Sequence, residues 1–418
     1  MILFNMATEL PNYLNENFFK TALEDGLHDE SVDIKKIILS DNNSGGGENY
    51  CSKIYRAKAL YRSSKTQLDE ELALIVKSIA ITPATQCLED FAVYLREKIF
   101  YFDALGKLEM LIGDNTKFGA KCFYSTCEPM QTIVFDDLTQ YGYRLASRQD
   151  GLDEGHCKVT LEKLGKFHAA SMVMAHQDPF IRDHFKTGML DEHYIRTSER
   201  FVDFMTLQLR TLAKLVATWG EDYKEITEKL HKHCDNITEN LVKTGQAKPN
   251  EITVLNHGDL WVNNFMFKYD ECNKKKPIDV VFVDFQHSFF GSPGCDINFF
   301  LNSSVQLNVL MKCRDSLIES YYAAFRESLQ RMQFEKIPTL EDMKTEITSR
   351  ELYGFFASYS FLPMIAMRKE DSYDINLETL ASKEFATKKV KLMFSSNHRT
   401  TDTLRYTLKR FNELGTLD

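Results

Sequence analysis

The chain has 418 residues, of which 43% are hydrophobic and 27% charged, which is typical of a globular protein with a large core and room for two or three domains. Its net charge of −9 argues against nucleic acid and anionic membranes as partners, because both bind basic surfaces. Nine scattered cysteines without a CxxC pair favour a reduced intracellular protein. No signal peptide is evident, and the longest apolar stretch, residues 352–367, is shorter than the roughly 20 residues of a membrane-spanning helix. We therefore predict a cytoplasmic protein without a membrane span.

In chain order, the first third of the sequence mixes helices and strands. A helix is predicted over residues 9–24. Apolar residues at positions 88, 91, 95, 99 and 102 predict a second helix over 87–105 with one buried face. The predicted strands, rich in β-branched and aromatic residues, are 33–42, 49–62, 71–80, 118–127 and 131–136.

After residue 138 the pattern becomes mainly helical. The predicted helical segments are 157–175, 197–244, 305–334 and 340–368, and only 264–284 interrupts them, as a β-hairpin with a polar tip. The sequence therefore predicts an α+β, bilobal protein. Its β-rich N-lobe would span residues 1–138, and its larger, helical C-lobe residues 139–418.

A glycine-rich loop lies between two of the predicted N-lobe strands. Gly46, Gly47 and Asn49 belong to it, and backbone without side chains can approach phosphate groups closely. A flexible turn would have the same composition. The loop is not a Walker A motif, because no GK[ST] follows it.

Two charged residues follow in the N-lobe. Lys77 lies inside the otherwise apolar strand "ALIVKSIA", and Glu97 lies in the helix that comes next. Such an acid can pair with the lysine and direct it at nucleotide phosphates. The alternatives are an edge-strand lysine and a solvated helical glutamate.

The stretch "VLNHGDLWVNNFMF" concentrates polar residues between apolar flanks. Asp259 is the candidate that orients a substrate hydroxyl, and Asn264, five positions later, is a candidate Mg²⁺ ligand. We expect His257 to brace this loop through hydrogen bonds, and Asn263 to be structural. Alone, the stretch could be a polar turn between core strands.

Asp284 ends the apolar strand "VVFVDF". A carboxylate there is costly unless a cation meets it, and a divalent cation bridging nucleotide phosphates would do so. Asp259, Asn264, a hairpin and then Asp284 have the order and spacing of a kinase catalytic loop and metal-ligand aspartate. Together with Lys77 and Glu97 they favour a phosphotransferase.

Five segments make the chain resemble the insect ecdysteroid kinase-like (CHK kinase-like) family, within the choline kinase and aminoglycoside phosphotransferase branch of the protein-kinase-like fold. These segments are "GENYCSKIYR", "VFDDL", "LGKFHAAS", "HGDLWVNNFMF" and "VDFQHSFFGSPGCDI". The resemblance covers roughly residues 30–400, and it implies transfer of phosphate from ATP to an alcohol with Mg²⁺.

The resemblance also implies roles for individual residues. Asp259 matches the catalytic aspartate, Asn264 and Asp284 the metal ligands, and Asp296 an acid that braces the catalytic loop. The implied nucleotide-binding residues are Gly46, Gly47, Asn49, Lys77, Glu97, Asp136 and Leu138, the last two through hinge backbone at adenine. The glycine loop lacks a full G-x-G-x-x-G, so the pattern does not specify which loop groups touch phosphate.

The acceptor is expected to be a small, apolar alcohol such as an ecdysteroid or a steroid-like compound. The aromatic and apolar side chains that suit it could also simply fill the helical core; they are Phe201, Phe204, Met205, Tyr353, Phe355, Phe356, Tyr359 and Phe361. Two rival hypotheses remain: a choline or aminoglycoside kinase, and a pseudokinase that binds a hydrophobic ligand or a partner protein.

Overall fold

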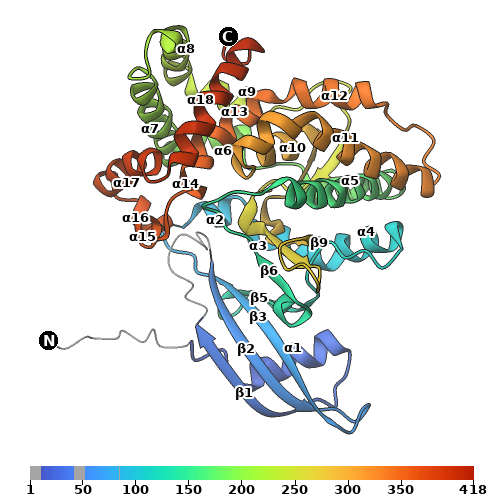
Figure 1. Cartoon of the computed structure of the whole chain (residues 1–418). Helices are drawn as coiled ribbons and strands as arrows, with labels where there is room; N and C mark the ends of the chain where they lie inside the picture. Colours follow the sequence, from blue (N-terminus) through green and yellow to red (C-terminus); the bar gives the residue numbers. More distant parts are fainter. Residues whose placement is uncertain (1–10, 42–51, 84) are drawn as a thin grey trace, which may run out of the picture.

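The computed structural model describes residues 11–41, 52–83 and 85–418. It has two lobes, a β-rich one at the bottom of Figure 1 and a larger helical one above it. This is the predicted α+β, bilobal arrangement of a protein-kinase-like fold. The division at residues 138 and 139 stays a prediction, although the N-lobe sheet does end at Asp136.

The N-lobe is built on a five-stranded antiparallel sheet with strand order β1-β2-β3-β5-β4. Its strands are β1 (Asp33–Asp41), β2 (Lys53–Arg62), β3 (Asp69–Ile79), β4 (Cys122–Thr126) and β5 (Gln131–Asp136). Strand β3 lies in the middle, between β2 and β5, and it carries Lys77. Lys77 is therefore on a central strand, which excludes the edge-strand alternative.

Helix α1 (Glu16–Leu27) covers one face of this sheet. It begins later than the predicted residue 9, because the Asn15 side chain caps it by accepting a hydrogen bond from the Phe18 amide. Phe19 and Leu23 are fully buried and form a separate small core with the sheet. On the opposite face, Ile133 and Phe135 join the larger core, whereas Ile75 and Lys77 line a cavity.

The helical segment after β3 differs from its prediction. It consists of α2 (Cys87–Asp90), α3 (Val93–Ile99), the π-helix η1 (Phe100–Ala104) and α4 (Leu105–Ile112). Ala92 has a left-handed backbone with φ 49°, which interrupts the helix, and the π turn shifts its register again. Leu95 and Phe102, expected on the buried face, are consequently 53% and 48% exposed.

The C-lobe is mainly helical, and its large core continues into the N-lobe through α3, η1 and α4. Its α-helices are α5 (Glu154–Gln177), α6 (Glu192–Thr197), α7 (Glu199–Val216), α8 (Lys224–Asp235), α9 (Ile237–Gly245), α10 (Pro293–Ser303), α11 (Leu307–Arg331), α12 (Leu340–Ser349), α13 (Glu351–Ser360), α14 (Leu362–Ile365), α15 (Lys369–Ser372), α16 (Leu377–Leu380), α17 (Lys383–Ser395) and α18 (His398–Glu413). Short 3₁₀ turns join them at η3 (Pro179–Phe185) and η4 (Glu221–Tyr223).

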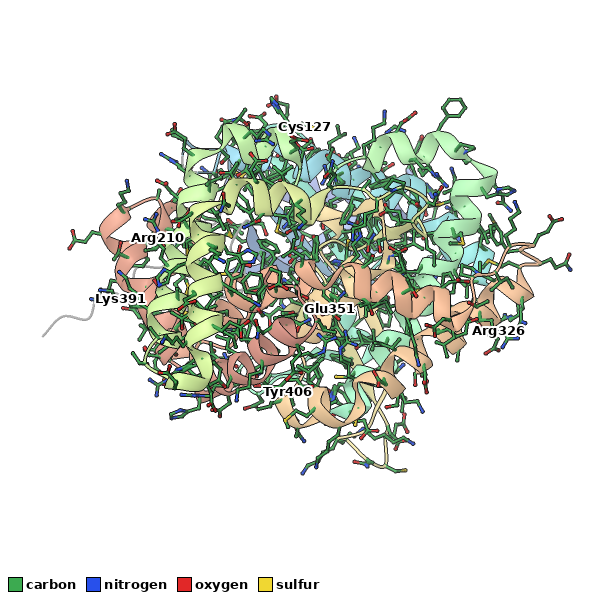
Figure 2. All side chains as sticks on the ribbon, turned by 90° about the horizontal axis from the view of Figure 1, so that it is seen from above. Cys127, Arg210, Arg326, Glu351, Lys391 and Tyr406 are labelled. Atoms are coloured by element: carbon green, nitrogen blue, oxygen red, sulfur yellow. The ribbon has the colours of Figure 1, made fainter. Side chains whose placement is uncertain are left out.

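Glu351 ties three of these helices together. Its carboxylate accepts hydrogen bonds from Arg314 at 2.7 Å and from Arg410 at 2.6 and 2.7 Å. Seen from above, Glu351 lies at the centre of the helices, whereas Arg326 and Lys391 lie at the periphery (Figure 2). The Glu351 side chain is only 3% exposed. Its two guanidinium partners are therefore required to balance its buried charge.

Two small sheets position the central loops of the C-lobe. Strands β6 (Tyr143–Leu145), β8 (Phe265–Tyr269) and β9 (Pro277–Phe282) form one sheet, and β7 (Val254–Asn256) and β10 (Phe289–Gly291) the other. The hairpin predicted over 264–284 is confirmed as β8 and β9. The segments that follow β7 and β9 both face the cleft.

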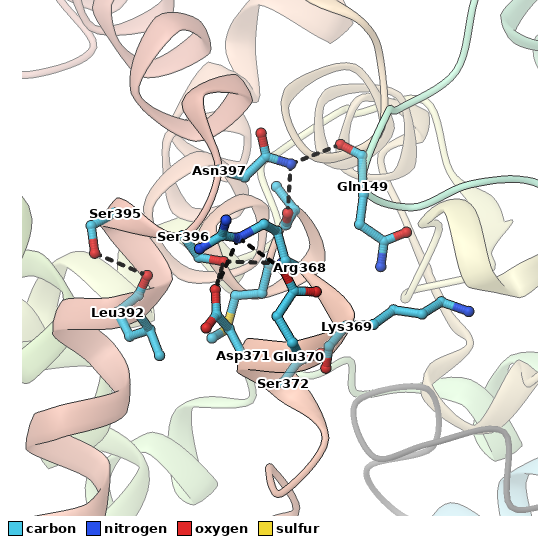
Figure 3. Close-up of polar contacts among 12 residues, drawn as sticks. Gln149, Arg368, Lys369, Glu370, Asp371, Ser372, Leu392, Ser395, Ser396 and Asn397 are labelled. Atoms are coloured by element: carbon cyan, nitrogen blue, oxygen red, sulfur yellow. Dashed lines mark hydrogen bonds and ion pairs between the residues drawn. The ribbon is translucent and has the colours of Figure 1, made fainter.

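A polar clamp joins the chain after the hinge to the C-terminal helices. Asn397 donates hydrogen bonds to the backbone oxygens of Gln149 and Ala366 at 3.1 and 2.9 Å. Beside it, the Ser396 hydroxyl and Arg368 both donate to Asp371 (Figure 3). The clamp therefore fixes α15 against α17 and α18.

The apolar stretch 352–367 forms α13 and α14, whose side chains are largely buried in the protein, as predicted. Within the described parts of the chain, no helix is both long enough and apolar enough to cross a bilayer.

Candidate active site

A cavity of about 390 Å³ lies between the two lobes. Its described lining comes mainly from β2, β3, α3, η1 and β5 on the N-lobe side, and from β6, β8 and the segments after β5, β7 and β9 on the other. The predicted site residues among this lining are Lys77, Glu97, Asp136, Leu138, Asp259, Asn264 and Asp284. Segments more than 200 residues apart in the sequence thus meet around one space.

One end of the cavity is an apolar slot. Ile54 and Ile75 line it from the sheet, and Met266 lines it from β8. Side chains alternate along a strand, so Ile75 shares a face of β3 with Lys77, and Met266 lines the cavity together with Asn264. A flat aromatic base could therefore lie between these aliphatic side chains, next to the polar groups.

The hinge borders this slot with backbone groups. The amide of Asp136 donates to the Lys121 carbonyl at 3.0 Å, and the amide of Asp137 donates to the Ala73 carbonyl at 2.9 Å. Leu138 begins the 3₁₀ helix η2 (Leu138–Tyr141), where the first amide has no acceptor inside the helix. At Asp136 only the carbonyl can therefore serve a base, while at Leu138 the amide can donate to one.

Lys77 joins the two lobes electrostatically. Its Nζ donates to Glu97 Oε2 at 2.7 Å and to Asp284 Oδ1 at 2.5 Å. Lys77 and Glu97 are 5% and 1% exposed, so the pair is buried, and the predicted contact between them is present. Glu97 is therefore not the solvated glutamate of the alternative interpretation.

Burial and the charge of the ion-pair partner have opposite effects on the pKa values of Lys77 and Glu97. Burial alone would lower the pKa of Lys77, but the carboxylates of Asp284 and Glu97 hold it above its ordinary value. Burial raises the pKa of Glu97 to about 7, with Asp284 adding to the rise and Lys77 opposing it. Lys77 is thus a permanent cation that two carboxylates share.

The loop after β7 is held by a buried carboxylate on α10. Asp296 accepts hydrogen bonds from the amides of His257 at 2.7 Å and Gly258 at 2.9 Å, which is the predicted bracing contact. Gly258 has φ +82°, and a Cβ there would lie 2.0 Å from the His287 carbonyl oxygen. Only glycine fits this turn.

His257 braces the same loop rather than facing the cavity. Its Nε2 lies 3.0 Å from the Val283 carbonyl, and its Nδ1 accepts from the Asp259 amide at 3.3 Å. The ring is fully buried, and burial lowers its pKa. A neutral ring with the proton on Nε2 satisfies both contacts, as expected of a structural histidine.

Asp259 and Asn264 are in direct contact. The Asn264 Nδ2 donates to the Asp259 backbone oxygen at 2.8 Å and to Asp259 Oδ2 at 3.2 Å. Asp259 Oδ1 is buried and accepts no hydrogen bond within the described residues. Burial and then the charge of Asp284 raise the pKa of Asp259 to about 7, against hydrogen bonds from Trp261 and Asn264.

Asp284 stands at a sharp turn after β9, with a left-handed backbone of φ 68° and ψ 61°. The next residue, Phe285, is fully buried and stacks on Phe100 with ring centroids 3.7 Å apart. This anchor leaves the Asp284 carboxylate 29% exposed at the cavity. Gln286 donates to the same carboxylate at 3.4 Å.

The donor set fits Mg²⁺ held together with phosphate. Magnesium prefers oxygen ligands and is commonly bound by one or two carboxylates plus nucleotide phosphates. Asp284 and Asn264 offer such oxygens, and the buried Oδ1 of Asp259 lacks a partner beside them. Among the described residues no three His, Cys, Asp or Glu side chains form a closed cation site, so phosphate oxygens would have to complete the shell.

Three predicted site residues lie outside the described part of the chain, and some residues that line the cavity were not predicted. Gly46, Gly47 and Asn49 lie outside the described residues. The slot residues and Tyr101, which also line the cavity, were not predicted, and Asn263, expected to be structural, lines the cavity as well. The two-residue spacing of Ile75 from Lys77 on one strand was the available signal.

Most of the aromatic and apolar side chains considered for the acceptor are core residues. Met205, Tyr353, Phe355, Phe356 and Tyr359 are at most 5% exposed. Phe201, Phe204 and Phe361 are only partly buried. The alternative that this set fills the helical core therefore holds for most of its members.

Comparison with known proteins agrees with this geometry. The ecdysteroid kinase-like family matches residues 46–334, about two-thirds of the chain, including Lys77, Asp259 and Asp284. Comparison with curated proteins gives no match. The chain belongs to the ecdysteroid kinase-like family, and membership implies a kinase-like phosphotransferase of small molecules.

Proposed function

We propose that the protein is an ATP- and Mg²⁺-dependent kinase that transfers the γ-phosphoryl group to a hydroxyl of a small apolar molecule, an ecdysteroid or a steroid-like compound. The observation that carries the proposal is the meeting of Lys77, Asp259, Asn264 and Asp284 around one cavity that also has an apolar slot and a backbone hinge. These are the parts that phosphoryl transfer requires.

The nucleotide-binding residues act by position and charge. The adenine base would lie between Ile54, Ile75 and Met266, with its edge at the Asp136 carbonyl and the Leu138 amide. Lys77, oriented by Glu97, would bind the α- and β-phosphates. Gly46, Gly47 and Asn49 remain proposed contacts of the phosphates.

The catalytic loop positions the acceptor. Asp259 would accept a hydrogen bond from the acceptor hydroxyl on Oδ1 and take its proton as the new P–O bond forms. A carboxylate whose pKa lies near 7 is suited to this exchange at neutral pH. Asn264 holds that carboxylate and, with Asp284, would bind the metal. Mg²⁺, when bound, would neutralise phosphate charge.

An aromatic path supports an apolar acceptor. Phe201 contacts Tyr194 with ring centroids 5.5 Å apart, Tyr194 contacts Phe91 at 3.8 Å, and Phe91 contacts His287 at 5.8 Å. Partly buried rings thus lead from α7 to the segment directly after Asp284. Aromatic faces also bind quaternary ammonium groups, so the path fits choline as well, and only the substrate test separates the two acceptors. The cytoplasm is the proposed compartment, and nucleic acid is not a proposed partner.

The test is metabolite profiling of a sterol-rich extract incubated with the protein, ATP and Mg²⁺. We expect an apolar alcohol to gain the mass of one phosphoryl group, and the Asp259→Asn variant to abolish this product. Rapid phosphorylation of choline instead would replace the apolar acceptor. Binding of Mg-ATP without turnover of any alcohol would indicate a pseudokinase.

A further inference from the structure

Arg96, on α3, is a buried cation without a carboxylate partner. It is 8% exposed, and no ion pair within 4 Å is found for it among the described residues. Its hydrogen bond there runs from Nη2 to the Thr187 hydroxyl, at 3.3 Å, and Nη1 is buried with no acceptor. Among the described residues, the Arg96 guanidinium therefore has one neutral hydrogen-bond partner, at the long distance of 3.3 Å.

The charge of the buried Arg96 guanidinium is not fully compensated by its described neighbours. A buried charge is usually paired, because an unpaired one loses its hydration without compensation. Burial lowers the pKa of Arg96, and the more distant charge of Asp191 opposes this only in part. An oxyanion in contact with Nη1 and Nη2 would complete the site.

Thr187 is placed to supply that oxyanion. It is exposed and lies in an irregular segment between η3 and α6, where a modifying enzyme can reach it. It also borders a cavity of about 140 Å³, which has room for an added group. Charges of both signs line the same cavity, Asp191 and Glu192 together with Lys186 and Arg350, and a covalently attached phosphate on Thr187 would be held beside Arg96.

We propose that Thr187 is a phosphorylation site and that Arg96 binds its phosphate. In the modification, a protein kinase transfers the γ-phosphoryl group of ATP: the bond from phosphorus to the leaving ADP oxygen breaks, and a bond to Thr187 Oγ1 forms. The hydroxyl proton passes to a base of that kinase. The product carries a charge of about −1.5 to −2 and three acceptor oxygens.

Binding of this phosphate by Arg96 would control the Lys77–Glu97 pair. Arg96 directly precedes Glu97 on α3, whereas Thr187 belongs to the C-lobe. A phosphate on Thr187 would tie α3 to the C-lobe and hold Glu97 against Lys77. This second step rests on the proposed kinase function, but the binding of phosphate by Arg96 does not.

The experiment compares the full chain with and without phosphothreonine incorporated at position 187. We expect the phosphorylated chain to have a Tm higher by about 1–3 °C, a shift appropriate to one or two new charge-assisted bonds in a protein of this size. We also expect its KM for Mg-ATP to fall roughly threefold. Both gains should vanish in Arg96→Gln, shrink in Arg96→Lys and persist in Lys98→Gln, the matched control on the same helix.

Three results would overturn the proposal. The first is a phosphorylated chain with an unchanged or lower Tm, and the second is a gain that persists in Arg96→Gln. The third comes from titrating the unmodified chain and Thr187→Val with inorganic phosphate: protection that needs Arg96, without any gain from phosphothreonine, would indicate a site for free oxyanions. A Tm gain that needs Arg96 in a protein without turnover supports the phosphate site and counts against the kinase function alone.

Peptide mass spectrometry of the full chain, expressed in eukaryotic cells, tests the modification itself. We expect a phosphate on the peptide that contains Thr187, removed by phosphatase treatment. That peptide recovered only in its unmodified form would count against the proposal.

Discussion

The two walls of the cleft hold their polar side chains by different means. On the N-lobe wall, Lys77 is held by ion pairs, to Glu97 on its own lobe and to Asp284 across the cleft. On the C-lobe wall, the loop that carries Asp259 is held by hydrogen bonds from backbone amides to the buried Asp296. One wall depends on ion pairs, and the other on shape and on hydrogen bonds donated by neutral backbone amides.

This difference teaches how each wall can fail. A Coulomb interaction tolerates small movements, and its cost appears when one partner is left buried without the other. A turn held by short hydrogen bonds tolerates no added volume. We therefore expect the N-lobe wall to respond to loss of charge, and the C-lobe wall to added atoms and to protonation.

The largest expected effect comes from Asp284, which joins the two walls. Asp284→Ala removes a carboxylate that faces both Lys77 and the proposed metal site, so we expect kcat for ATP-dependent phosphorylation to fall roughly a thousandfold. The side chain is 29% exposed, so the fold should survive with a single cooperative transition. Glu271→Gln, at the exposed hairpin tip, is the control. Turnover within tenfold of the wild type would contradict the proposed role.

The next effect tests shape on the C-lobe wall. Gly258→Ala places a Cβ against the His287 carbonyl in addition to the strain of φ +82°, so we expect a loss of about 3 kcal/mol in the free energy of unfolding. Gly142 also has a positive φ, of +83°, but nothing lies within 4 Å of its added Cβ. Gly142→Ala should therefore cost only about 1 kcal/mol. Equal losses in urea unfolding would mean that the close contact at Gly258 is unimportant.

A smaller effect tests charge on the N-lobe wall. Lys77→Met leaves Glu97 buried without its cation, whereas the double variant with Glu97→Gln leaves no buried charge in the pair. We expect Lys77→Met alone to be less stable than the double variant, with a coupling energy of about 1–3 kcal/mol. A urea-unfolding cycle over the four proteins measures this coupling. Additive effects would show that the pair is not energetically coupled.

The catalytic loop could be predicted from the sequence because its chemistry is local. Asp259 and Asn264 are five residues apart, and the contact between them needs only one turn. The hairpin and Asp284 follow by strand periodicity. The contacts of Lys77 could be expected only by matching spacings to a known pattern, because its partners are 20 and 207 positions away.

The parts that could not be predicted depend on tertiary packing. Apolar periodicity assigned Leu95 and Phe102 to the buried face, but the left-handed Ala92 and the π turn interrupt that periodicity, and the charged Arg96 is buried instead. Nothing in the local sequence marks such a shift. The aromatic residues of α13 suit an apolar ligand and a helical core equally well by composition, and only the packing places them in the core.

The smallest expected effect concerns protonation behind the C-lobe wall. His168 is fully buried, and its neutral ring satisfies two contacts: Nε2 lies 3.3 Å from Asp296 Oδ2, and Nδ1 lies 2.9 Å from the Tyr321 hydroxyl. Burial lowers the pKa of His168 below 6.5, although Asp296 opposes this. The unfolded chain therefore binds a proton at this residue at a higher pH than the folded protein does. Stability from this group is present above about pH 6.5 and is lost as the pH falls, by up to about 1.4 kcal/mol per pH unit.

His168→Gln removes this titration and keeps a side chain that can donate to Asp296. The measurement is urea unfolding at about pH 7.5 and about pH 5.5, one value on each side of the unperturbed histidine pKa. We expect acidification to lower the free energy of unfolding more for the wild type than for the variant. The other titrating groups are common to both proteins, so the difference isolates His168. Equal losses would mean that the ring is protonated in the folded state. The C-lobe wall would then depend on an ion pair with Asp296, as the N-lobe wall depends on Lys77, and the contrast between them would disappear.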